Sequence, residues 1–166
     1  MARKRRWLDA EEQCAWRAYL LATQLLWEDL DRQLQRDSGL AHSHYGILVA
    51  LSEAPDRSMR MSDLAALQRF SQSRLTHAIA RLEKDGYVER RKCAEDRRGQ
   101  FAVLTDTGMA ALRAAAPGHV AEVRAKVFDH LSPEQVRAMA DVFGALMPGL
   151  DPPAVACRGH EVAVDE

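Results

Sequence analysis

Short polar and basic side chains recur at helical spacing in the middle of the chain. One side of an amphipathic helix carries, on successive turns, Ser73, His77, Ala80 and Lys84, and Thr76 and Arg81 flank them. Hydroxyl, imidazole and guanidinium groups can contact base edges and phosphates, and small side chains permit close approach. This face therefore suits a DNA major groove, although a solvated surface helix would carry the same residue types.

Local signals define the ends of this helix. Ser71 is a good N-cap, because its hydroxyl can accept a hydrogen bond from an amide left without a partner in the first turn. Gly86 readily adopts the left-handed conformation that ends a helix. Four apolar residues between them form a stripe that must be buried: Leu75, Ala78, Ile79 and Leu82.

A shorter helix is predicted just before this one. Ser62 is expected to cap a helix from 63 to about 68, and Arg69 and Phe70 then form a tight turn. Two short helices joined in this way make a helix-turn-helix, in which the second helix is held out for the groove.

A hairpin is predicted after the same helix. The apolar period changes to two, which indicates strands at 87–93 and 100–104. The tip between them carries Arg97 and Arg98, which can reach a minor groove, and Asp96, which can hold one arginine in a fixed direction. A solvated charged turn is the alternative interpretation.

Longer helices are predicted on both sides of this central region. Asp9 and Glu12 give a capping-box pattern at the start of the first helix, and Ser132 and Gln135 repeat it at the start of the last. Pro117 predicts a kink or a break in the helix between them. The remaining helices are expected at about 9–38, 43–53, 105–130 and 132–147.

The composition is that of an ordinary soluble protein, with 166 residues, 47% apolar and 28% charged. The net charge is −1, yet residues 57–100 hold 11 Lys and Arg against 6 Asp and Glu, a net of +5 that leaves −6 for the rest. A basic DNA-binding centre on an acidic scaffold would have this distribution. Without an apolar run of membrane length or a signal peptide, we expect a cytoplasmic protein with no membrane partner.

The other reactive residues form no catalytic or metal-binding pattern. The sequence has no glycine-rich phosphate loop and no paired catalytic residues, so we expect neither an enzyme nor a cofactor. His42 and His44 do not face each other on a helix, and the three cysteines are widely spaced, so no metal site is expected. Cys14 and Cys93 leave a thiol-based redox sensor as an alternative.

Three blocks of sequence follow one another at residues 71–90, 96–98 and 104–108. Together they resemble the MarR family of bacterial transcriptional regulators, over roughly residues 10–148. The resemblance implies a mainly α fold with a small β-hairpin, a winged helix-turn-helix flanked by N- and C-terminal dimerisation helices. It also implies a homodimer that binds a pseudo-palindromic operator, with recognition helices in major grooves and wing arginines in minor grooves.

The chain is expected to divide into a basic tail at 1–8, a MarR-type domain at 9–149 and a tail at 150–166. The prolines and the lack of periodicity in this last tail predict disorder. Within the domain, the winged core is expected at about 43–104, and the dimerisation helices at about 9–38 and 105–148.

The candidate site residues follow from the motif and the resemblance together. Candidates for DNA contacts are Arg69, Ser71, Gln72, Ser73, Arg74, Thr76, His77, Arg81, Lys84, Asp96, Arg97 and Arg98. The family implies a repressor released by a small aromatic or carboxylate effector, and candidates for its pocket are Trp16, Tyr19, Trp27, His44 and Tyr45. A protein-interaction module that has lost DNA binding is a further alternative.

The chain departs from the family pattern at one turn and at one helix cap. Arg69 stands where the family usually has a glycine, and a non-glycine residue in the left-handed conformation costs on the order of 1 kcal/mol. We therefore expect a reshaped turn, or a phosphate contact from Arg69. Ala41 stands where the second helix usually has a threonine cap.

Overall fold

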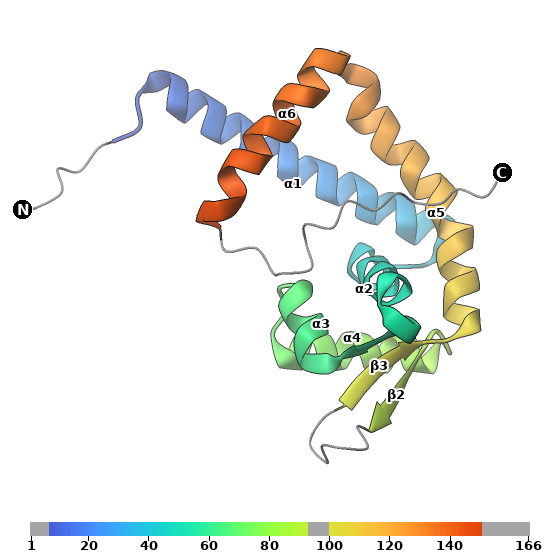
Figure 1. Cartoon of the computed structure of the whole chain (residues 1–166). Coiled ribbons are helices and arrows are strands. Elements are labelled where there is room, and N and C mark those ends of the chain that lie inside the picture. Colours follow the sequence, from blue (N-terminus) through green and yellow to red (C-terminus); the bar gives the residue numbers. More distant parts are fainter. Residues whose placement is uncertain (1–6, 93–99, 151–166) are drawn as a thin grey trace, which may run out of the picture.

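The computed structural model describes residues 7–92 and 100–150, and these form a mainly helical fold with one small sheet (Figure 1). The helices are α1 (Ala10–Ser38), α2 (His42–Glu53), α3 (Met61–Leu67), α4 (Gln72–Lys84), α5 (Asp106–Lys126) and α6 (Pro133–Leu146). Single turns of 3-10 helix lie at η1 (Pro55–Arg57), η2 (Phe128–His130) and η3 (Met147–Gly149). The predicted fold class, a winged helix-turn-helix between terminal helices, is confirmed. Within the described ranges, no helix is long and apolar enough to cross a membrane.

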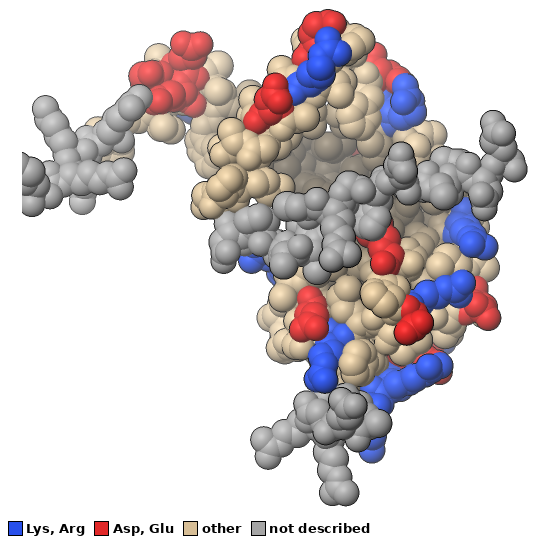
Figure 2. Space-filling view, viewed as in Figure 1, with Lys and Arg blue, Asp and Glu red and all other residues tan. Residues whose placement is uncertain are grey.

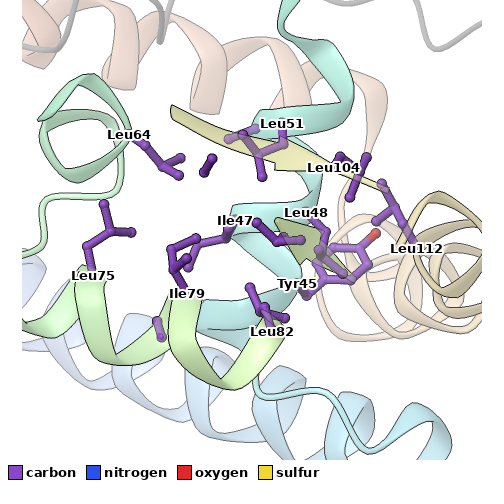
Figure 3. Packing of buried hydrophobic residues seen from close by; sticks show 14 of the residues in the cluster. Tyr45, Ile47, Leu48, Leu51, Leu64, Leu75, Ile79, Leu82, Leu104 and Leu112 are labelled. Atoms are coloured by element: carbon purple, nitrogen blue, oxygen red, sulfur yellow. The ribbon is translucent and has the colours of Figure 1, made fainter. Parts of the chain in front are cut away.

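The core holds the helix-turn-helix in place. Leu75, Ile79 and Leu82 of α4 are fully buried, in one cluster with Leu48 of α2 and Leu64 of α3 (Figure 3). Burying an aliphatic side chain of this size stabilises the fold by roughly 1.5–3 kcal/mol. The predicted apolar stripe of α4 is thus confirmed, and it fixes which face of the helix points outward.

The sheet has one more strand than the predicted hairpin. β3 (Gln100–Leu104) lies between β2 (Val88–Lys92) and β1 (Ser58–Arg60) and is antiparallel to both. The prediction that Ser62 caps the helix after β1 is wrong. Arg60 pairs with Phe101, so the chain stays extended up to Arg60, and α3 begins at the next residue.

The outer helices follow most of their predicted limits. Both capping boxes are present, from Asp9 to Glu12 and from Ser132 to Gln135. α5 packs along α1 and continues through Pro117, so the predicted break is absent from this described helix, which changes direction along its length in Figure 1. It ends at Lys126, four residues before the predicted end, and η2 follows.

Candidate nucleic-acid interface

The outward face of α4 carries the central group of candidate DNA-binding residues. The buried stripe turns the opposite side of the helix to solvent, and the Ser71 hydroxyl caps it by accepting a hydrogen bond from the Arg74 amide across 3.2 Å. The exposed candidates in and beside α4 are Ser71, Gln72, Ser73, Arg74, Thr76, His77, Arg81 and Lys84. The first three turns of this face hold no acidic side chain, so they do not repel phosphate.

Three hydroxyl groups on this face are engaged within the protein. The Thr76 hydroxyl donates to the carbonyl oxygen of Gln72 across 2.8 Å. Ser71 and Ser73 share a hydrogen bond of 3.1 Å between their hydroxyls. Thr76 therefore presents an oxygen lone pair and a methyl group to a ligand, and its hydroxyl proton is already used. A lone pair accepts from a base amino group, and a methyl group suits the methyl of thymine.

The turn before α4 keeps a regular helix-ending geometry in spite of its sequence. The Phe70 amide donates to the carbonyl of Ala65 across 2.9 Å, and the Arg69 amide donates to the carbonyl of Ala66 across 3.2 Å. This pattern is a Schellman motif, which requires a left-handed residue at the position of Arg69. Arg69 has φ +53°, so the arginine itself takes the conformation that glycine usually supplies, and the expected reshaping of the turn does not occur.

A cationic hollow of about 410 Å³ lies between the start of α2 and the exposed side of α4. Arg74, Arg81 and Lys84 supply its positive charge. His44 also lines it, and burial together with the nearby Arg81 charge lowers the pKa of this imidazole. In Figure 2 the lower part of the molecule carries further Lys and Arg with acidic side chains among them, and another acidic group lies at the start of α1.

The wing strands are tied to α4. Arg90 on β2 forms an ion pair with Glu83 across 2.8 Å, and its amide donates to the same carboxylate across 3.1 Å. These contacts fix the direction of β2 relative to α4. The predicted wing residues Asp96, Arg97 and Arg98 lie outside the described residues.

The block at 104–108 locks the corner between α4, β2 and α5. The Thr105 hydroxyl donates to the carbonyl of Gly86 across 2.7 Å and accepts from the Gly108 amide across 2.9 Å. A Cβ on Gly108 would lie 2.1 Å from the carbonyl oxygen of Tyr87, so only glycine fits here. This part of the family-like pattern therefore has a packing reason.

The five effector candidates do not share one pocket in this chain. Tyr19 and Trp27 line an apolar cavity of about 430 Å³ between α1, the end of α5 and α6. The Trp16 ring stacks on Tyr19 with 5.9 Å between ring centres. Tyr45 is buried in the core beside His119, with 4.6 Å between the rings, and His44 faces the hollow beside α4.

Asp31 plays a role that the sequence analysis did not identify. Its Oδ1 accepts a hydrogen bond of 2.7 Å from the His42 amide, so it caps the first residue of α2, whose N-cap Ala41 offers no capping side chain. The cap comes from eleven residues upstream, on another helix, and no local signal reveals it. His42 lies against Trp27 and His119, with ring centres 4.6 and 5.6 Å away.

The remaining candidates for chemistry do not converge. Cys14 is an exposed free thiol on α1, and Cys93 lies outside the described residues. In the ranges that the structure covers, no group of three or more His, Cys, Asp or Glu could hold a metal ion.

Comparisons with known proteins agree with this geometry. A family model described as the MarR family matches residues 38–99. The structure of Sco3205, a MarR family transcriptional regulator from Streptomyces coelicolor solved in complex with DNA, is 52% identical, with a TM-score of 0.85 over 90% of this chain and 93% of that one. AbsC, a MarR family regulator from the same organism, is 46% identical, with a TM-score of 0.80 over 89% of this chain and 97% of that one.

A more distant relative is the transcriptional repressor YetL of Bacillus subtilis. It is 31% identical over 112 residues, which cover 65% of this chain and 66% of YetL. These relatives are transcriptional regulators, a class of protein distinct from enzymes. The chain belongs to the MarR family of winged helix-turn-helix transcriptional regulators.

Proposed function

We propose that this regulator binds a specific double-stranded DNA operator through the outward face of α4. The observation that carries the proposal is the exposed polar and cationic face of a helix whose other side is fully buried. Its cationic groups suit phosphates, and its short polar groups suit base edges. Sco3205, which is 52% identical, was solved in complex with DNA, and this likeness supports DNA binding here.

The wing is the second proposed contact. Arg97 and Arg98 are assigned to a minor groove and Asp96 to orienting one of them, on the sequence pattern alone. Arg69 is assigned to a phosphate, because an arginine kept in a left-handed conformation at a surface turn is typical of a functional residue.

A homodimer accounts for the uncovered apolar surface at both ends of the chain. On α1, Trp16, Leu21 and Leu25 remain 51–59% exposed, and Val142 on α6 is 57% exposed. None of the described residues of α6 is buried, although the helix has an apolar stripe. A second copy would cover these faces and would present two recognition helices to a symmetric operator. The proposed core at 43–104 then lies between dimerisation helices at 9–38 and 105–148.

The regulator is proposed to be a repressor that a small aromatic or carboxylate compound releases. The apolar cavity beside Tyr19 and Trp27 has Lys126 and His130 in its lining, which suits a ring with an acidic group. The cavity lies between α1, the end of α5 and α6, so a ligand in it would favour one arrangement of the dimer helices. A ligand weakens operator binding only as far as it prefers an arrangement that does not match the operator.

The test is a binding titration of the purified full-length protein at two salt concentrations. The probes are a duplex from upstream of its own coding region and a scrambled duplex of the same composition. The proposal predicts preferential binding to the upstream duplex, with an affinity that falls steeply as salt rises. A protein that binds neither duplex at low salt would instead support the interaction-module alternative.

A further inference from the structure

Phe70, in the turn before the recognition helix, lies against Arg74 on the helix itself. The guanidinium carbon of Arg74 is 4.2 Å from the centre of the Phe70 ring. Phe70 is half-buried and packs against the hydrophobic core, whereas Arg74 is exposed. A guanidinium stacked on an aromatic face is attracted to the ring and keeps its N–H groups available for a partner.

The backbone is fixed at both residues of this pair. The Phe70 amide donates to the carbonyl of Ala65, as part of the turn described above, and the Arg74 amide donates to the Ser71 hydroxyl. The ring is held in a fixed turn, and its contact with the guanidinium favours one direction of the Arg74 side chain before any ligand binds. An arginine without this support would lose rotamer freedom on binding and would bind more weakly for that reason.

We propose that Phe70 is a positioning residue that holds Arg74 for contact with a guanine in the major groove. The inference rests on the proposed DNA binding and adds to it the residue that sets one element of sequence preference. A guanine offers two acceptors, O6 and N7, which match the two parallel N–H groups of a guanidinium. Because both hydrogen bonds must align at once, this contact depends on the direction of the arginine far more than a phosphate contact does.

The test selects bound duplexes from a randomised DNA pool with the full-length protein and its variants. The wild type should enrich a guanine at one position of each half-site, and Arg74→Ala should lose that enrichment. Phe70→Leu keeps an apolar side chain but removes the ring, and it should lower the preference at the same position by roughly two- to fivefold. Phe70→Tyr keeps the ring and should restore it.

A double variant separates positioning from general destabilisation. If Phe70 acts through Arg74, Phe70→Leu should cause no further loss of affinity for the selected duplex in the Arg74→Ala background. Phe101→Leu is a matched control, because it removes the ring that lies 5.2 Å from the Arg60 guanidinium on the sheet. It should leave the preference at that position unchanged.

Several results would overturn the inference. These are an unchanged guanine preference in Phe70→Leu, additive losses of duplex affinity in the double variant, or failure of Phe70→Tyr to restore the preference. If Phe70→Leu does not fold, the contact can be tested in the wild-type NMR spectrum. A ring that lies against Arg74 must shift its side-chain protons upfield. Arg74 side-chain protons at their ordinary chemical shifts would refute the contact. A wild type that binds DNA without enriching any guanine refutes this inference alone, whereas a wild type that binds no DNA refutes the proposed function as well.

Discussion

The carboxylate of Asp31 caps a helix other than its own. Its Oδ1 lies 2.7 Å from the amide nitrogen of His42, so α1 supplies the cap that the sequence of α2 lacks. This bond joins a proposed dimerisation helix to the first helix of the winged core. Asp31→Ala should destabilise the fold by about 1 kcal/mol, the usual cost of removing a cap, as measured by urea unfolding.

Asp31→Asn tests the same bond by keeping the acceptor oxygen and removing the charge. The amide oxygen can still accept from His42, so this variant should remain close to the wild type in stability. Asp29→Ala, which removes a neighbouring carboxylate paired with Lys126 at the surface, should have a much smaller effect than Asp31→Ala. Equal losses for the two alanine variants would contradict the capping role.

Arg69 combines backbone strain with a proposed contact, and substitutions can separate the two. Arg69→Gly relieves the left-handed strain and should stabilise the protein by roughly 0.5–1 kcal/mol, net of the greater freedom of glycine in the unfolded chain. It should also weaken operator binding and lower the salt dependence by about one phosphate contact.

Arg69→Ala removes the charge but keeps the strain. It should weaken DNA binding as much as Arg69→Gly does, without the gain in stability. DNA affinity equal to that of the wild type in both variants would exclude the phosphate contact.

His42 at the start of α2 and His119 on α5 predict a loss of stability in mild acid. Burial lowers the pKa of His42, and the facing imidazole of His119 lowers it further, while the charge of Asp31 opposes the shift. Burial also lowers the pKa of His119. The unfolded chain therefore binds more protons than the folded one, and stability should fall as the pH drops below about 6.5. In His119→Phe the melting temperature should change less between pH 7 and pH 5 than it does in the wild type. A change as large as that of the wild type would contradict this prediction.

The proposed dimer predicts that a charge on the exposed side of α6 separates the subunits. Val142→Glu would place a carboxylate in the proposed interface, where burial without a partner is costly, so light scattering should report a monomer. Ala66→Glu puts the same charge on the exposed side of α3 and should leave a dimer. A protein from which residues 150–166 are deleted should also remain a dimer. A dimer of unchanged strength in Val142→Glu would show that another surface joins the subunits.

Local sequence signals predicted the helices well because their causes are local. The capping box of Asp9 and Glu12, the Ser71 cap and the stripe of α4 each depend on residues within a few positions. β1 escaped prediction because three residues are too few to show a period, and the strand exists only through its pairing with β3. The error at Ser62 has the same origin, since the distant strand keeps Arg60 extended.

The helix that carries the site was predictable from the sequence, whereas the residues that pack against the site or cap its neighbouring helix were not. Spacing alone identified the outward face of α4, because its opposite face had to be buried. Spacing gave no sign that Phe70 would stack on Arg74 or that Asp31 would cap α2, since both depend on side-chain directions and packing. Among the effector candidates, Tyr45 of α2 proved to be a core residue.

The most direct test of the account compares base contacts with backbone contacts on α4. Arg74→Ala and His77→Ala are titrated against the operator and a scrambled duplex at one salt concentration. If these side chains read bases, each variant should lose roughly 1–3 kcal/mol on the operator and much less on the scrambled duplex. Equal losses on both duplexes would contradict the claim that the outward face of α4 recognises sequence.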